Sequence, residues 1–156
     1  MFKLNFKNKE DMDSSKEILN DALVGLFNQV LLKEESYMKS KMTSSLTLNN
    51  VHILEAVNSF ENCCTMSELA GKLRVTVSTL STNIKKLIDN NYLLKRQSKA
   101  DKRVFYVKLT QKGNKILKIH EEYHKKMIDL IATNLSNKET ADLIDLLSKI
   151  KYFFSE

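Results

Sequence analysis

The sequence predicts a mainly α-helical fold with one small β-hairpin, and three observations support this class. The chain of 156 residues contains no proline and only three glycines, so little interrupts its helices. Apolar residues recur at helical spacing through most of its length. Two short β-prone runs, residues 93–97 and 104–109, are joined by a charged tip and depart from the helical pattern. At this length we expect a single domain, residues 1–156, with a buried core.

Long helices are expected at both ends of the chain. Helical spacing of apolar residues covers residues 14–39, and after a polar break a second helix is expected over residues 47–59. Thr110 can cap a helix that runs to about residue 134, and a last helix covers about residues 137–154. Each of these two C-terminal helices carries one face whose residues repeat at helical intervals: Ile116, His120, Tyr123, Met127 and Ile131 on the first, Ala141, Ile144, Leu147, Ile150 and Phe154 on the second.

Two shorter helices in the middle of the chain carry their own start signals. The residues from Thr65 to Glu68 form a capping-box pattern, which predicts a helix through Leu73. Thr76 is a second N-cap, and the helix that follows should stop at Asn90 and Asn91, because Asn tolerates the left-handed conformation.

The order helix, short helix, tight turn, helix, hairpin and helix predicts a winged helix-turn-helix. At about 100° per residue, the second helix of the pair places apolar residues on one side, which we expect to face the core: Val77, Leu80, Ile84, Leu87 and Ile88. The opposite strip suits a DNA major groove because it carries small hydroxyl and basic side chains: Ser78, Thr79, Ser81, Thr82, Lys85 and Lys86, with Asp89 at the far end. The alternatives are a solvated structural helix and a winged helix that binds proteins, which would favour an apolar or acidic helix face.

Positive charge is concentrated in the same part of the chain. The whole protein has a net charge of +6, but residues 72–118 carry thirteen Lys and Arg against two acids, a net of +11. This distribution indicates a polyanionic partner, with nucleic acid as the first expectation.

The chain resembles the MarR transcriptional regulators over nearly its whole length, and most closely from Thr65 to Gly113. The stretch "VTVSTLSTNIKKLIDNNYLLKRQSKADKRVFYVKLTQKG" matches the family pattern of a Ser/Thr-rich recognition helix, a D-x-R wing at Asp101 and Arg103, and an L-T-x-x-G junction that ends at Gly113. Asn91 stands where the family usually has Gly, and Lys102 replaces a frequent second arginine.

The resemblance implies a homodimer that binds a palindromic operator on double-stranded DNA. It implies dimerisation helices at about residues 14–40 and 113–156 around a winged domain at about 45–112, with Arg103 in the minor groove and Asp101 orienting it. Together with the helix face, it gives the candidate DNA-binding residues: Thr76, Ser78, Thr79, Ser81, Thr82, Lys85, Lys99, Asp101, Lys102 and Arg103.

Two effector classes remain open. The segments "LFNQVLLKEE", "LTLNNVHILEAV" and "KIHEEYHKKM" look similar to the fatty-acid-synthesis repressors, which are thought to respond to acyl chains on acyl carrier protein. That reading predicts a repressor of fatty-acid synthesis genes with a ligand pocket lined by these residues: Phe27, Leu31, Val51, His52, His120 and Tyr123. Plain core packing is the other interpretation of these side chains.

The alternative is a zinc-sensing repressor of the same family. His120 and His124 are four residues apart on one helix, a spacing that can hold one transition metal. His52 falls where zinc-sensing members also place a histidine, and Glu34 and Glu35 are candidate substitutes for the family's carboxylate ligand. The other interpretation is a set of hydrogen-bonded histidines with no metal or other cofactor.

Catalysis, secretion and membrane insertion find no support in the sequence. There is no Gly-rich phosphate loop and no nucleophile-base signature, so we expect no enzyme. We expect a cytoplasmic protein, because the N-terminus lacks the pattern of a secretory signal and no apolar run could span a membrane. The adjacent Cys63 and Cys64 are expected to be reduced thiols, with a redox switch as the alternative.

Overall fold

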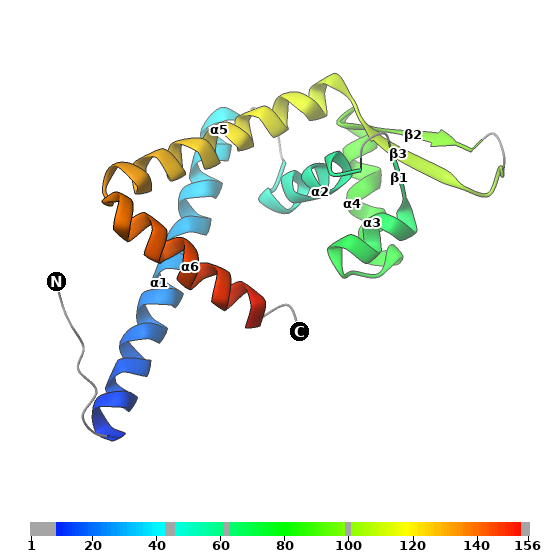
Figure 1. The fold of residues 1–156 in the computed structure, drawn as a ribbon. Coiled ribbons are helices and arrows are strands. Elements are labelled where there is room, and N and C mark those ends of the chain that lie inside the picture. Colours follow the sequence, from blue (N-terminus) through cyan, green and yellow to red (C-terminus); the bar gives the residue numbers. More distant parts are fainter. Residues whose placement is uncertain (1–8, 43–45, 61–62, 99–100, 154–156) are drawn as a thin grey trace. The chain divides into compact units, whose positions relative to one another are not determined.

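The computed structural model describes residues 9–42, 46–60, 63–98 and 101–153, which divide into two compact units, Met1–Thr47 and Leu48–Glu156. The first unit contains one long helix, α1 (Lys9–Lys41), which begins five residues before the predicted start at Ser14 (Figure 1). Residues 9–13 are charged except for Met12, so apolar periodicity could not reveal this segment as helix.

The second unit contains the remaining elements, which apart from the short strand β1 follow the order that the sequence predicts. They are α2 (Leu48–Asn58), β1 (Cys64–Thr65), α3 (Met66–Leu73), α4 (Val77–Asp89), β2 (Leu93–Gln97), β3 (Phe105–Leu109), α5 (Gln111–Thr133) and α6 (Asn137–Phe153). The mainly helical winged helix-turn-helix fold is therefore confirmed. In Figure 1 the β2–β3 hairpin extends beyond α3 and α4 as the wing.

The sheet has three antiparallel strands in the order β1-β3-β2. Leu93 pairs with Leu109 and Lys95 with Val107 across the hairpin, while Cys64 pairs with Val107 on the other side of β3. The sequence did not reveal β1, because a strand of two residues is too short to show alternation.

The core of this unit fixes the place of α4. Side chains from α2, α3, α4 and both wing strands are almost fully buried: Val51, Leu54, Leu69, Leu80, Leu87, Leu93 and Val107. A polar contact adds to this packing, because the Asn50 amide on α2 lies 3.4 Å from the Asn83 amide oxygen on α4. The prediction that Val77 faces the core is wrong, since its side chain is 42 % exposed.

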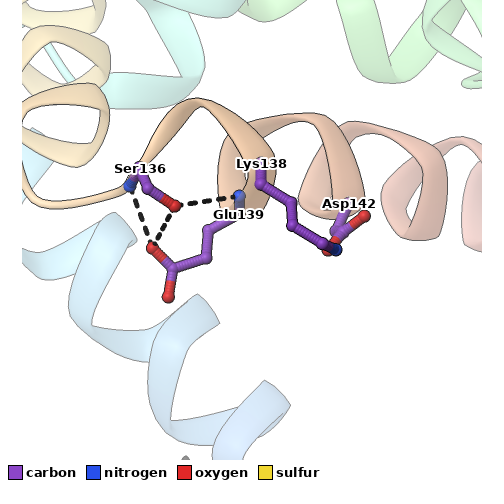
Figure 2. Close-up of polar contacts among 4 residues, drawn as sticks. All are labelled: Ser136, Lys138, Glu139 and Asp142. Atoms are coloured by element: carbon purple, nitrogen blue, oxygen red, sulfur yellow. Dashed lines mark hydrogen bonds and ion pairs between the residues drawn. The ribbon is translucent and has the colours of Figure 1, made fainter.

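Capping boxes begin two of the helices. At α3 the Thr65 hydroxyl accepts a hydrogen bond from the Glu68 backbone N–H at 3.2 Å, while the Glu68 carboxylate accepts one from the Thr65 backbone N–H at 2.7 Å. Ser136 and Glu139 form the same reciprocal pair before α6, beside an exposed Lys138–Asp142 ion pair (Figure 2). The Ser-x-x-Glu spacing at Ser136 carried the same signal as the predicted box at Thr65 and was missed.

Candidate nucleic-acid interface

Thr76 starts the recognition helix α4. Its side chain accepts a hydrogen bond from the Thr79 backbone N–H at 3.2 Å, which confirms the predicted cap. The Thr76 hydroxyl also lies 3.0 Å from the Ser78 hydroxyl and 2.8 Å from the Thr79 hydroxyl. Three of the predicted DNA-binding side chains are therefore tied into one hydroxyl cluster at the helix N-terminus.

The rest of the predicted strip is exposed, as DNA contact requires. The exposed residues of α4 include Ser78, Thr79, Ser81, Thr82, Lys85 and Lys86. The Ser81 hydroxyl donates to the Val77 carbonyl at 2.7 Å, so toward solvent it presents acceptor lone pairs.

The turn between α3 and α4 depends on a left-handed arginine. Arg74 has φ 54° and ψ 40°, and its N–H bonds to the Gly71 carbonyl while the Val75 N–H bonds to the Ala70 carbonyl. These bonds satisfy carbonyls at the end of α3 and redirect the chain into α4 within two residues. The sequence predicts a tight turn at Arg74 and Val75, but not its left-handed conformation, because Arg carries no preference for that region.

The wing tip is shaped by backbone hydrogen bonds around Asp101. The Asp101 carboxylate accepts from the Arg103 backbone N–H at 2.8 Å, and the Val104 N–H donates to the Asp101 carbonyl at 3.0 Å. The Gln97 amide donates to the Lys102 carbonyl at 2.6 Å. Asp101 thus acts on the backbone of the turn, which leaves Lys102 and Arg103 exposed at its end. Lys99, also predicted to bind DNA, lies outside the described residues.

An aromatic contact stiffens the wing behind this tip. Lys95 Nζ lies 3.9 Å from the centroid of the Phe105 ring, across the β2–β3 pair. A cation over an aromatic face is attracted by the ring quadrupole. This attraction holds the charged Lys95 side chain along the hairpin.

The junction between the wing and α5 explains the L-T-x-x-G pattern physically. The Thr110 hydroxyl donates toward the Asn91 carbonyl at 2.7 Å and also lies 3.1 Å from the Tyr92 carbonyl oxygen, while it accepts from the Gly113 N–H at 3.1 Å. A Cβ on Gly113 would collide with the Tyr92 carbonyl oxygen and lie 2.9 Å from Leu109 Cδ2. Asn91 has φ 62°, which confirms the predicted left-handed stop after α4.

The three histidines converge inside the second unit. His120 Nε2 lies 3.1 Å from His124 Nε2 on α5, and the ring centroid of His52 on α2 lies 5.7 Å from that of His120. The Tyr123 ring packs edge-on against His124, with centroids 5.4 Å apart. His120 is buried and His52 and His124 are partly buried. The predicted histidine set therefore forms one cluster.

The sequence matches a known family of transcriptional regulators over more than half of its length. Residues 35–120 match the family described as "Transcriptional regulator SarA/Rot". The chain belongs to the SarA/Rot family. This SarA/Rot protein is 33 % identical to the HTH-type transcriptional regulator YhjH of Bacillus subtilis over 85 residues, which are 53 % of its chain and 47 % of YhjH. The chain thus spans about half the length of that relative. It is 25 % identical to the transcriptional regulator AdcR of Streptococcus pyogenes over 88 % of its own chain and 95 % of AdcR.

Solved structures confirm the MarR-type architecture of this SarA/Rot protein. The DNA complex of Streptococcus pneumoniae FabT aligns with a TM-score of 0.84 and 26 % identity, over 90 % of this chain and 97 % of FabT. Mutant MarR from E. coli with operator DNA aligns with a TM-score of 0.64 and 25 % identity, over 86 % and 95 % of the two chains. The chain accordingly shares its family and its fold with transcriptional regulators, and the FabT structure was solved in complex with DNA. No helix in the described ranges has the length and apolar character needed to cross a membrane.

The predicted ligand pocket draws on both units of this SarA/Rot protein. In the second unit Val51 is fully buried and Tyr123 is 8 % exposed. In the first unit Phe27 is 60 % exposed and Leu31 is 51 % exposed. The pocket stays a prediction, because these exposures describe each side chain and not an enclosed space.

The two cysteines differ in their surroundings. Cys63 is exposed, whereas Cys64 is fully buried in β1. Burial, followed by the nearby Glu68 carboxylate, raises the pKa of the Cys64 thiol to about 11. Cys64 is therefore a neutral thiol at physiological pH, which makes it a poor nucleophile.

Proposed function

We propose that this protein is a homodimeric repressor that binds a palindromic operator in the cytoplasm, with α4 in the major groove and Arg103 in the minor groove. The observation that carries this proposal is the exposed hydroxyl and lysine strip of α4 beside a wing tip that presents Lys102 and Arg103. Phosphate contacts from such cations position a protein on the duplex, and side chains at the helix N-terminus meet base edges.

Exposed apolar side chains on the terminal helices support the homodimer. A single chain leaves the following large apolar residues of α1 and α6 exposed: Ile18, Leu19, Val24, Leu26, Phe27, Leu31, Leu32, Ile144, Leu146, Leu147 and Ile150. Monomeric proteins rarely expose large apolar patches, and each of these two helices exposes several large apolar side chains. A second copy of the chain, packed against the same helices, would remove this surface from water.

Arg103→Ala tests the DNA contact. The variant should lose affinity for the operator by roughly tenfold or more, and the salt dependence of binding should fall by about one unit of slope if the guanidinium neutralises a phosphate. Fluorescence anisotropy with a labelled duplex at several salt concentrations measures both. Lys125→Ala removes one exposed charge from the middle of α5 and serves as the control. Equal affinities for Arg103→Ala and Lys125→Ala would refute the wing contact.

A zinc-responsive regulator is the second candidate, and the histidine cluster favours it. Two nitrogen ligands of a tetrahedral zinc ion lie about 3.3 Å apart for bonds of about 2.0–2.1 Å. The 3.1 Å separation of the His120 and His124 Nε2 atoms is close to this value, and neutral imidazoles are common zinc ligands. The His120–His124 pair therefore suits two positions of a zinc site, and His52, with its ring centroid 5.7 Å from that of His120, would supply the third ligand. When bound, zinc would supply a link between imidazoles of α2 and α5.

Competition with a chromophoric chelator tests this candidate. The purified protein should bind one zinc ion per chain tightly, and His120→Ala should abolish that binding. Glu34→Gln and Glu35→Gln form a matched pair for the sequence prediction that one carboxylate of α1 completes the ligand set. Metal binding by His120→Ala equal to that of the unmodified protein would exclude the cluster as the site.

An acyl-responsive repressor of fatty-acid synthesis genes remains the other effector proposal. Its support is the resemblance of three segments of the sequence to the fatty-acid-synthesis repressors. The same anisotropy titration distinguishes the two effectors. An acyl-responsive repressor would change its operator affinity when acyl chains on acyl carrier protein are added. A zinc-responsive repressor would change it when zinc is added.

A further inference from the structure

Two large apolar side chains are exposed in the part of the winged helix-turn-helix region that the structure describes. Among the described residues from 46 to 112, only Val75 and Val77 are exposed large hydrophobics, at 41 % and 42 %. Both flank Thr76, the N-cap of the recognition helix. The two side chains therefore lie at the helix-turn-helix corner, where the protein meets DNA.

Val75 has a structural explanation that Val77 lacks. Val75 immediately precedes the N-cap, and Leu80 occupies the fourth position of α4, the two positions that a hydrophobic staple uses. Its N–H also completes the end of α3 through the Ala70 carbonyl. Val77 is the first residue of α4, where neither a cap nor a staple calls for a branched apolar side chain.

The helix geometry places Val77 at one edge of the strip that faces DNA. Residues four apart lie on the same side of a helix, so Val77, Ser81 and Lys85 form one row. Ser81 and Lys85 are exposed, and the Ser81 hydroxyl bonds back to the Val77 carbonyl. This row begins with an apolar side chain and continues with a hydrogen-bond acceptor and a cation. It therefore suits the major groove, which presents thymine methyl groups beside hydrogen-bond donors and acceptors.

We infer that Val77 recognises the C5-methyl group of a thymine in the operator. The N-terminal residues of a recognition helix approach base edges in the major groove, where the thymine methyl is the apolar feature. This inference rests on the proposed function, because it needs α4 in that groove. The branched side chain of Val77 then excludes water from the methyl, and the neighbouring hydroxyls bond polar edges.

A thymine-to-uracil scan measures this contact directly. The operator is first obtained by selection from random duplexes, and each thymine is then replaced by uracil, which removes only the methyl group. For the unmodified protein, one thymine position in each half-site should be sensitive. A single uracil at that position should weaken binding about fourfold, which is the effect of losing the burial of one methylene-sized apolar group. Val77→Ala should weaken binding to the thymine operator and be insensitive to uracil at that position.

Val75→Ala is the matched control and should keep the uracil effect of the unmodified protein. Val77→Thr, which keeps one methyl group, replaces Val77→Ala if the latter is poorly folded by circular dichroism. The inference is overturned if Val77→Ala loses the same factor on uracil substitution as the unmodified protein, or if no uracil replacement matters. Failure of the unmodified protein to bind any selected duplex would instead overturn the proposed function.

Discussion

Gly113→Ala should destabilise the fold, although it replaces glycine by the best helix former within α5. The added Cβ would meet the Tyr92 carbonyl oxygen, a backbone atom that cannot rotate away, and would lie 2.9 Å from Leu109 Cδ2. Either α5 or the turn after α4 must then move. That movement would strain the hydrogen bond from Thr110 N to the Tyr92 carbonyl, now 3.1 Å long.

The size of the effect follows from two opposing terms. Forcing an extra methyl-sized group into a packed site costs about 1–3 kcal/mol. Replacement of glycine by alanine inside a helix contributes about 0.5–1 kcal/mol in the other direction. The free energy of unfolding should therefore fall by roughly 1–2 kcal/mol, a large share of the few kcal/mol that hold a domain together.

Gly71→Ala provides the control, because a Cβ at that position of α3 would meet nothing within 4 Å. It should raise the free energy of unfolding by about 0.5–1 kcal/mol through helix propensity alone. Urea unfolding followed by circular dichroism measures both variants, at one protein concentration because the stability of the proposed dimer would depend on it. If Gly113→Ala is as stable as Gly71→Ala, the close approach at the junction is not a constraint.

Three further outcomes are expected. The pKa of Glu68 and that of Glu139 lie below the ordinary 4.5, because each carboxylate accepts a backbone hydrogen bond. Both caps therefore stabilise the fold above pH 4.5, and this stabilisation is lost as the pH falls through the pKa values of the folded protein. In an acid titration of stability, the double variant Glu68→Gln, Glu139→Gln should not show this loss. Iodoacetamide at pH 8 should label Cys63 rapidly and Cys64 only after unfolding, as mass spectrometry of the peptides can show. Leu147→Glu should convert the proposed dimer to monomer in size-exclusion chromatography with light scattering, since this 53 % exposed side chain would lie in the interface.

Local signals made most of the fold predictable. Thr65, Thr76 and Thr110 cap the helices they were expected to cap, because a hydroxyl at an N-cap satisfies a backbone N–H wherever the helix lies in the molecule. Asn91 takes the left-handed conformation for an equally local reason. The wing also follows from local composition, since its strands lie within one residue of the predicted runs.

What the sequence could not predict depends on contacts between distant residues. Periodicity assigned Val77 to the core because its angle on the helix is next to that of Ile84, yet Val77 is 42 % exposed at the first position of α4, where the helix emerges from the packed core. The left-handed Arg74 is imposed by the packing of α3 and α4, against the preference of its own side chain. The convergence of His52 with His120 required α2 and α5 to pack together, which spacing along one helix cannot show.

The same contacts give the histidine cluster a route to the DNA-binding helix. His52 lies on α2, which also touches the middle of α4 through Asn50 and Asn83. His120 lies on α5, about 10 Å along the helix from Gly113, where Thr110 ties α5 to the chain just after α4. We propose that a ligand that favours one spacing of α2 and α5 would act on α4 through these two contacts, and it would shift operator affinity only by its own preference between the two spacings. Operator DNA must then change the affinity for that ligand by the same factor, because the coupling free energy is shared by both binding events.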